Sequence, residues 1–485
     1  MIIALSQTMA RLVTCLAAVI RRCSSRAPGG AIRKRSALPV VGWFLPILML
    51  VCAPLALGQT LVEAVRKSLE ESPRLQAARQ TLKSAEQKRK GAAAGYWPSL
   101  DLSLGYGQEW SNTTTTRPAN GEIWLERGES GLSLNQTVFD GFATRSQVRA
   151  AESTVAAERA ALDETAETVA LETIEAYLGV LERQEALALL REQRELMGNI
   201  HARVREMETL GLGTRVDVIQ AQSRVQTVDS DLVAAQGALR EAQTLLSRYL
   251  RESPAGLARP ELPVGLIPDR EETILEQALG RAATLRRSLH QLEAAKARHR
   301  GQKADLWPQM SFNLDYANND NVSGVRSYSE NLKAMMQVTF NLFNGGAHAA
   351  GIAEGAEQVG YQQALLDEAR DGKTVEARTA WSLHRSSRER LGHLKNSLEG
   401  SRRVVAAYHE QFRMGQRPLL DVLNAENELF GSKRTLLTEE VNVLRTGYRL
   451  LGAMGTLLAA LDPPPAPTTA PPPPTAAPPP PPPPP

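Results

Sequence analysis

The side chains that most often carry enzymatic or metal chemistry are scarce in this chain and poorly spaced for it. All three cysteines, Cys15, Cys23 and Cys52, lie within the first 58 residues. The remainder therefore offers no thiolate metal site and no disulfide framework. The seven histidines form no metal-binding spacing, and no glycine-rich phosphate loop follows a strand pattern. We expect no catalytic residue, no metal and no cofactor, so the chain is not predicted to be an enzyme.

The charge is concentrated at the start of the chain. There are 56 Lys and Arg against 53 Asp and Glu, a net charge of +3. Residues 1–58 contain seven of the basic residues and none of the acidic ones, so without them 49 basic and 53 acidic residues leave −4. A nucleic-acid partner therefore loses its main support.

The same leader has the order of a secretory signal peptide. A basic cluster, Arg33-Lys34-Arg35, precedes an apolar run from Leu38 to Leu57. The alternative is a transmembrane anchor helix, but three prolines interrupt the run. We predict that residues 1–58 are a cleaved signal peptide.

Two segments of the chain repeat at a nearly fixed offset. Phe139-Asp140-Gly141 corresponds to Phe343-Asn344-Gly345 at an offset of 204, whereas Trp97-Pro98 corresponds to Trp307-Pro308 at 210. The six-residue difference belongs in a loop between these motifs. We predict two copies of one unit, 59–252 and 271–460, joined by a connector at 253–270. A proline-rich tail at 461–485 is predicted to be disordered and to favour polyproline II.

Within each copy, two segments have a hydrophobic period of two, which predicts four strands arranged as two hairpins. Four strands are too few to enclose a lumen, so a membrane barrel would need several copies of the chain. A soluble sandwich sheet is the alternative. The apolar positions are Leu100, Leu102, Leu104 and Tyr106; Leu132, Leu134 and Val138, with Gln136 as the exception; Met310, Phe312, Leu314 and Tyr316; and Met336, Val338, Phe340 and Leu342.

The rest of each copy is predicted to be helical. The segment from Phe142 to about Leu210 contains no proline and would form a helix of roughly 100 Å. From Val218 to Tyr249, ten apolar or small residues alternate at spacings of three and four, a coiled-coil pattern. A long dimeric coiled coil would explain this pattern but not the strands.

Shorter helices and turns complete each unit. Helical stretches from Leu61 to Ala93 and from Leu275 to Lys303 are expected to precede the strands. Gly211-Leu212-Gly213 and Met414-Gly415 are expected to break the long helices. Each copy then ends in a helical hairpin whose tip lies near Asp217 or Asp421.

The duplicated helix-strand-strand-helix unit resembles the TolC-type family of outer-membrane efflux and type I secretion channels. The resemblance covers roughly residues 60 to 455 and rests also on the segments 93–100, 136–141 and 415–425. It implies a homotrimer in which four strands per chain form a twelve-stranded barrel in the outer membrane of a Gram-negative cell. The long helices would form a periplasmic α-barrel. Segment 136–146 is similar to members that serve type I secretion.

The resemblance also assigns roles at the helical tips. Asp421 matches an aspartate that forms an acidic ring at the periplasmic constriction, where three carboxylates near one axis would attract cations. Asn424 occupies the place of a second acidic ring. Arg417 and Asp217 match partners in links that hold the tips closed. Phe412 replaces a tyrosine of one such link and lacks its hydroxyl.

These features predict a passive exit duct that is gated at its tips. Its expected partners are two further copies of the chain, a periplasmic membrane-fusion adaptor, an inner-membrane ABC or proton-driven transporter, and outer-membrane lipid. An outer-membrane factor for multidrug or metal efflux is the alternative within this class. The rival from another class is a periplasmic coiled-coil adaptor, which would have one helical hairpin and no lipid-facing strands.

Overall fold

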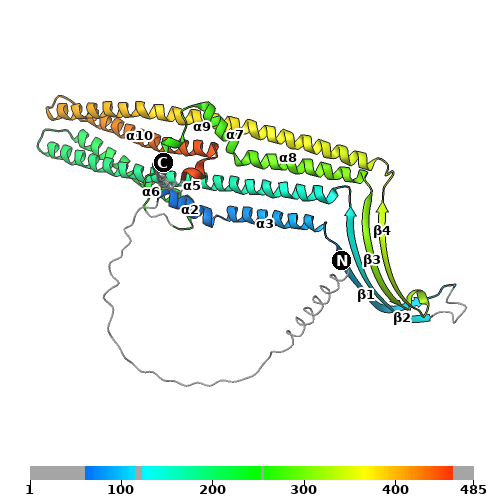
Figure 1. Ribbon diagram of the computed structural model, residues 1–485. Coiled ribbons are helices and arrows are strands. Elements are labelled where there is room, and N and C mark those ends of the chain that lie inside the picture. Colours follow the sequence, from blue (N-terminus) through cyan, green and yellow to red (C-terminus); the bar gives the residue numbers. More distant parts are fainter. Residues whose placement is uncertain (1–59, 115–122, 253–255, 462–485) are drawn as a thin grey trace, which may run out of the picture. The chain divides into compact units, whose positions relative to one another are not determined.

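The computed structural model describes residues 60–114, 123–252 and 256–461. The chain divides into Met1–Leu55 and Ala56–Pro485, and all described elements belong to the second unit. The predicted signal peptide lies outside the described residues, as does the predicted tail after Leu461. The structure is mainly helical and contains one antiparallel sheet of four strands, which confirms the predicted fold class (Figure 1).

The elements follow one another in two similar series. The two longest helices have 67 residues each and begin 204 residues apart, at Ala143 and Ala347. The first helices of the two series have 11 residues each and begin 210 residues apart, at Leu61 and Glu271. The first series is α2 (Leu61–Glu71), α3 (Pro73–Ala94), β1 (Ser99–Ser111), β2 (Ile123–Phe139), α5 (Ala143–Thr209) and α6 (Arg215–Leu250). After η1 (Val264–Leu266), the second is α7 (Glu271–Arg281), α8 (Ala283–Gln302), η2 (Lys303–Leu306), β3 (Gln309–Asp320), η3 (Val322–Gly324), β4 (Tyr328–Thr339), α9 (Ala347–Arg413), α10 (Leu419–Ala453) and α11 (Leu457–Leu461).

The predicted helical stretches before the strands are present, and each is broken into two helices, a break that the prediction did not include. In the first copy the break falls at Ser72, whose backbone is extended (φ −64°, ψ 120°). Pro73 disfavours a helical conformation at the residue before it, and the Ser72 hydroxyl then caps α3 by accepting from the Leu75 N–H. The second copy breaks at Ala282, where no proline follows, so the sequence alone does not indicate that break.

The strands form the two predicted hairpins, and pairing of β2 with β3 joins them into one sheet in the order β1-β2-β3-β4. Leu100 pairs with Leu134, which pairs with Leu314, which in turn pairs with Ala334. Residues in register lie on the same face of a sheet. The apolar positions of all four strands therefore form one continuous face.

Two details of that face differ from the prediction. A bulge between Thr137 and Phe139 places Phe139, not Val138, opposite Met310. A bulge adds one residue to a strand and so reverses the alternation beyond it. In addition, β4 ends at Thr339, so Phe340 and Leu342 lie beyond the strand, and Leu332 begins its apolar series instead.

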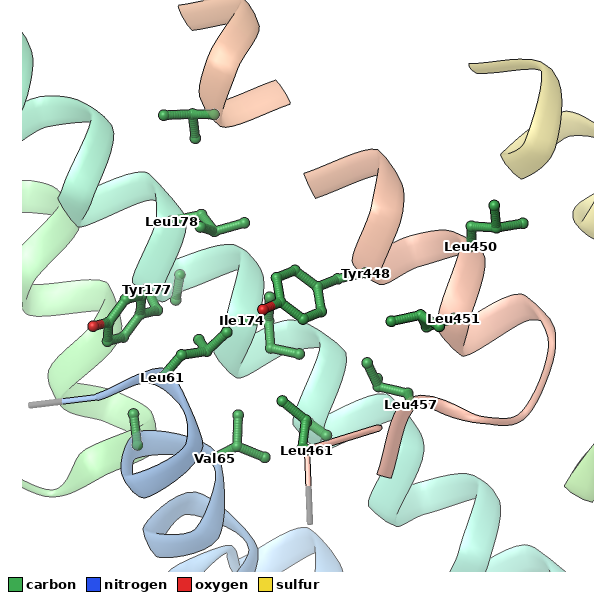
Figure 2. Packing of buried hydrophobic residues seen from close by; sticks show 14 of the residues in the cluster. Leu61, Val65, Ile174, Tyr177, Leu178, Tyr448, Leu450, Leu451, Leu457 and Leu461 are labelled. Atoms are coloured by element: carbon green, nitrogen blue, oxygen red, sulfur yellow. The ribbon is translucent and has the colours of Figure 1, made fainter. Parts of the chain in front are cut away.

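The helices pack along predicted faces. On α6, Ala221 and Leu246 of the heptad series are buried and its other members are half-buried, whereas Val233, outside the series, is 67% exposed. The largest core cluster joins α2, α5, α6, α7, α9, α10 and α11, and Figure 2 shows Tyr177 of α5 near Tyr448 of α10. No helix of the described segments is long and apolar enough to cross a membrane.

The two core tyrosines also hold the connector between the copies. The Tyr177 hydroxyl donates to the carbonyl of Ala258 at 2.6 Å, and the Tyr448 hydroxyl donates to that of Glu261 at 3.2 Å. Burial raises the pKa of each tyrosine to about 12. Hydrogen bonds from buried, neutral tyrosine hydroxyls therefore hold the connector against both long hairpins.

Between α9 and α10 lies a buried histidine whose environment opposes protonation. His384 is 4% exposed, and its Nδ1 lies 3.2 Å from the Thr446 hydroxyl. Burial, reinforced by the nearby Arg388, lowers the pKa of His384. A histidine whose pKa is lower in the folded state does not reduce the free energy of unfolding above its unfolded-state pKa of about 6.5. Below that pH the unfolded state gains a proton first, so stability is lost as the pH falls towards and through the folded-state pKa.

We predict that His384→Asn reduces the acid sensitivity of unfolding. The free energy of unfolding should fall less steeply between about pH 7 and pH 5 in the variant. The reason is that asparagine does not titrate, so the unfolded state no longer binds a proton at this position that the folded state does not bind. Denaturant unfolding at a series of pH values checks this. His393→Asn, at an exposed position on the same helix, is the control and should keep the wild-type slope. Equal slopes in all three proteins would contradict the assignment.

Candidate functional site

The predicted site residues lie at the tips of the two helical hairpins, α5–α6 and α9–α10. Gly211 and Gly415 have φ angles of 74° and 70° at these tips. This left-handed conformation is readily adopted by glycine, which explains why each long helix ends there.

At the second tip, Arg417 and Asp421 form an ion pair. The Nη1 atom of Arg417 donates to Oδ2 of Asp421 at 2.9 Å, and its Nε donates to Oε1 of Gln411 at 2.6 Å. The guanidinium carbon also lies 3.8 Å from the centroid of the Tyr408 ring. Arg417 is thus held by a carboxylate, an amide and an aromatic face at once, and it balances the charge of Asp421 within the chain.

Asp217, at the first tip, has a local role in the structure. Its Oδ2 accepts from the Thr214 hydroxyl at 2.7 Å and from the Thr214 N–H at 3.2 Å, while its own N–H donates to that hydroxyl. This is a capping box that fixes the start of α6. Among the described residues, no hydrogen bond or ion pair joins Asp217 to Arg417, so the structure brings Arg417 to Asp421 and not to Asp217.

The two tips contact each other through Asn424 and an apolar cluster. Nη2 of Arg224 on α6 donates to Oδ1 of Asn424 on α10 at 3.3 Å. Phe412 packs against a cluster in which Val204 of α5 meets Leu423 of α10. Phe412 therefore contributes apolar contact at the place where the missing hydroxyl was expected to weaken a link.

Sequence reasoning missed a buried pair behind this tip. Glu426 is 4% exposed, and its Oε1 lies 2.6 Å from Nε2 of His409. His409 lies six residues before Gly415 and Glu426 eleven residues after it, so counting outwards from the glycine alone would not have paired them. The spacing of Arg417 and Asp421, four residues apart at a helix start, could have predicted their ion pair.

The turn of each hairpin also carries exposed apolar side chains. Leu212 is 72% exposed at the first tip, and Met414 is 61% exposed at the second. We call these residues, with their exposed neighbours, the tip patch; it comprises Leu210, Leu212, Val216 and Ile219 of the first tip and Met414 and Leu420 of the second.

The sheet has an exposed apolar face and two unpaired edges. Leu104 is 75% exposed and Leu332 is 72% exposed. Within the described chain, β1 pairs only with β2, and β4 pairs only with β3. Exposed aromatic residues lie near both ends of the strands: Trp110, Trp124 and Tyr328 at the hairpin end, and Trp97, Trp307 and Phe340 at the helix end.

The opposite face of the sheet is polar. Asp101, Ser133, Asp315 and Lys333 lie in register across the four strands. Asn313 lies on the same face, two residues from Asp315. The sheet thus separates an apolar side from a polar one, as the wall of a membrane channel does.

Comparisons with known proteins agree with this arrangement. The profile of the outer membrane efflux protein family matches residues 64–250 and 274–456. The outer membrane efflux protein BepC of Brucella suis is 25% identical over 405 residues, covering 83% of this chain and 87% of BepC. The alkaline protease secretion protein AprF of Pseudomonas aeruginosa is 25% identical over 435 residues, covering 86% of this chain and 88% of AprF. The crystal structure of CusC, 18% identical, superposes with a TM-score of 0.72 over 82% of this chain and 92% of that one.

We predict that Leu423→Ala loosens the contact between the two tips. Leu423 is 1% exposed in the cluster with Val204, and such a truncation costs about 2–5 kcal/mol. Denaturant unfolding measures the loss. Leu420→Ala is the matched control, because Leu420 lies three residues earlier on the same helix and is 44% exposed. It should change the free energy of unfolding by less than about 1 kcal/mol. If both variants lose the same amount, the cluster does not join the tips.

Proposed function

We propose that this chain, which belongs to the outer membrane efflux protein family, works as a passive exit channel in the outer membrane. The observation that carries the proposal is the four-stranded sheet with its exposed apolar face and two unpaired edges. Its polar face carries Asp101 and Asp315 in one row. An apolar outer face and a polar inner face suit a wall between lipid and a water-filled lumen.

The unpaired edges support an assembly of three chains. Backbone N–H and C=O groups left unpaired in a membrane cost several kcal/mol each. If β1 of one chain pairs with β4 of the next, three chains give twelve strands and no free edge. The helices that continue from the strands would then line a periplasmic tunnel. In this proposal residues 1–58 are the export signal, and 59–252 and 271–460 are the two repeats.

The helical tips are the proposed gate. In the single chain, Arg417 neutralises Asp421 at 2.9 Å, which favours a closed arrangement. Separation of this pair would leave three carboxylates around the axis, and their mutual repulsion would hold the tips apart. A periplasmic adaptor that covers the tip patch would stabilise the open state, and an inner-membrane ABC or proton-driven transporter would supply the energy.

Export of protein is the first candidate for the cargo, and efflux of small molecules is the second. The name of AprF describes secretion of a protease. Segment 136–146 is also similar to family members that serve type I secretion. The name of BepC favours efflux. The adaptor hypothesis fails on the structure, because the chain has two long helical hairpins and a four-stranded sheet.

Cell fractionation tests the assembly. The mature chain should sediment with outer membranes, resist extraction by carbonate and run as a trimer after mild detergent solubilisation. Truncation of both strand hairpins should release it to the periplasm. A full-length chain found as a soluble periplasmic monomer would rule out the channel.

Single-channel conductance tests the gate. Asp421→Ala should weaken block by periplasmic multivalent cations by roughly tenfold or more, because a tenfold change needs only about 1.4 kcal/mol of lost attraction. Arg417→Ala should increase the open fraction by unpairing Asp421. The control is Arg215→Ala, an exposed arginine of the other tip, which should leave both properties unchanged. Unchanged block in Asp421→Ala would place the cation site elsewhere.

A further inference from the structure

A strongly basic pocket lies where β2 passes into α5 and α8 passes into β3. Its volume is about 350 Å³. Four cationic side chains line it, and all four residues are exposed: Arg145, Arg149, Arg300 and Lys303. Its lining contains no carboxylate, and among the described residues none of the four cations has an ion pair or a hydrogen bond through its side chain. Four like charges gathered in one pocket without a counter-charge repel one another.

Helix stability does not explain two of these cations. Arg145 and Arg149 lie in the first turns of α5, whose first turn holds no acidic residue. The helix dipole favours anions there and disfavours cations. Asp140, just before the helix, accepts hydrogen bonds from the N–H and hydroxyl of Thr144 through Oδ2 and pairs with neither arginine among the described contacts. Arg145, in the first turn, therefore opposes the helix dipole, and Arg149 lies one turn further on; a residue that breaks a local rule in this way is typical of a functional site.

The duplication provides an internal comparison. At the offset of 204 residues, the counterparts of Arg145 and Arg149 on α9 are Ala349 and Ala353. Yet α9 has the same length as α5, 67 residues. The helix start therefore does not require the arginines, and only the first copy has them.

The pocket borders the apolar face of the sheet. The ring of Phe142, in the pocket lining, contacts Phe139 edge-on with centroids 5.5 Å apart. Phe139 pairs in register with Met310 of the apolar face. Phe142 and Trp307 in the lining are 53% and 55% exposed. Exposed aromatic rings beside cations, at the edge of an apolar surface, are typical of the interface between a membrane and water.

The pocket is also rigid and lies within a single chain. Gly141 has a φ of 63°, and a Cβ on it would collide with the Ala304 carbonyl and with Trp307, so the two junctions are in close contact. The helix α5 packs against α3 and α8, and α8 packs against α9. The pocket is therefore lined by residues of α5, of α8 and of the segments next to them in one chain, and α5 and α8 are the two inner helices of the row.

We propose that this pocket binds the phosphate of an anionic phospholipid head group in the membrane leaflet beside the helices. The arginine guanidinium groups and the lysine ammonium group would donate hydrogen bonds to the phosphate oxygens. Phe142 and Trp307 would contact the glycerol and the upper part of the acyl chains. The assignment rests on the proposed function only in placing the apolar face of the sheet in lipid.

The test compares lipid binding by the full-length protein and three double variants. Detergent-solubilised protein is titrated with short-chain phosphatidylglycerol or phosphatidylcholine and followed by native mass spectrometry. Wild type should bind phosphatidylglycerol at least about tenfold more tightly than phosphatidylcholine. Arg145→Ala with Arg149→Ala should abolish that preference, and lysine at both positions should restore part of it. Arg203→Ala with Arg205→Ala, the same charge change on exposed residues near the other end of α5, should not affect it.

Three outcomes would overturn the proposal. They are a preference that survives in the Arg145/Arg149 alanine variant, equal loss in both alanine variants, and complete displacement of the lipid by equimolar inorganic phosphate, which would mark a site for the free ion. Conductance and trimer formation are measured on the same samples. Failure of the channel would therefore be distinguishable from failure of the lipid site.

Discussion

The constraint on which the rest of this molecule depends is the need of backbone N–H and C=O groups for partners. The sheet leaves two long edges unpaired, along β1 and β4, and it presents an apolar face to its surroundings. In water such edges invite uncontrolled pairing with other chains, and in lipid they are too costly to leave open. Closure by further copies of the same chain, as proposed above, would satisfy both requirements. In the proposed channel each chain would form one part of a closed wall.

The long helices extend this arrangement from the sheet to the tips. Three residues separate β2 from the helix α5, which runs for 67 residues, roughly 100 Å, to its tip. Buried contacts are concentrated around Tyr177 and Tyr448, where the connector is fastened. Near the tips a separate and smaller apolar cluster, with Leu423 buried in it, joins the two hairpins together with the hydrogen bond from Arg224 to Asn424. In the proposed channel the tips could therefore separate without disturbing the larger core.

The sequence predicted those features that follow from periodicity. The alternation around Leu102 and the spacing from Val218 to Tyr249 each specify which side of the element is apolar, whatever the neighbours are. Local exceptions were not predictable in this way. The bulge before Phe139 and the break at Ala282 have no distinct residue signal, whereas the break at Ser72 could have been read from the proline that follows it. The contact of Arg224 with Asn424, and the pocket around Arg145, depend on which helices pack together, and only the structure supplies that information.

Disulfide trapping between chains tests the central claim most directly. The chain has no cysteine after Cys52, so a cysteine at Ser103 on β1 can be combined with single cysteines at successive positions of β4. Because β1 and β4 are opposite edges of the sheet in one chain, a bond between them must join two chains. Edge closure predicts covalent dimers and trimers in outer membranes, strongest at one register and alternating along β4. If no β4 position crosslinks to Ser103→Cys in outer membranes, the strands do not close the sheet and the account fails.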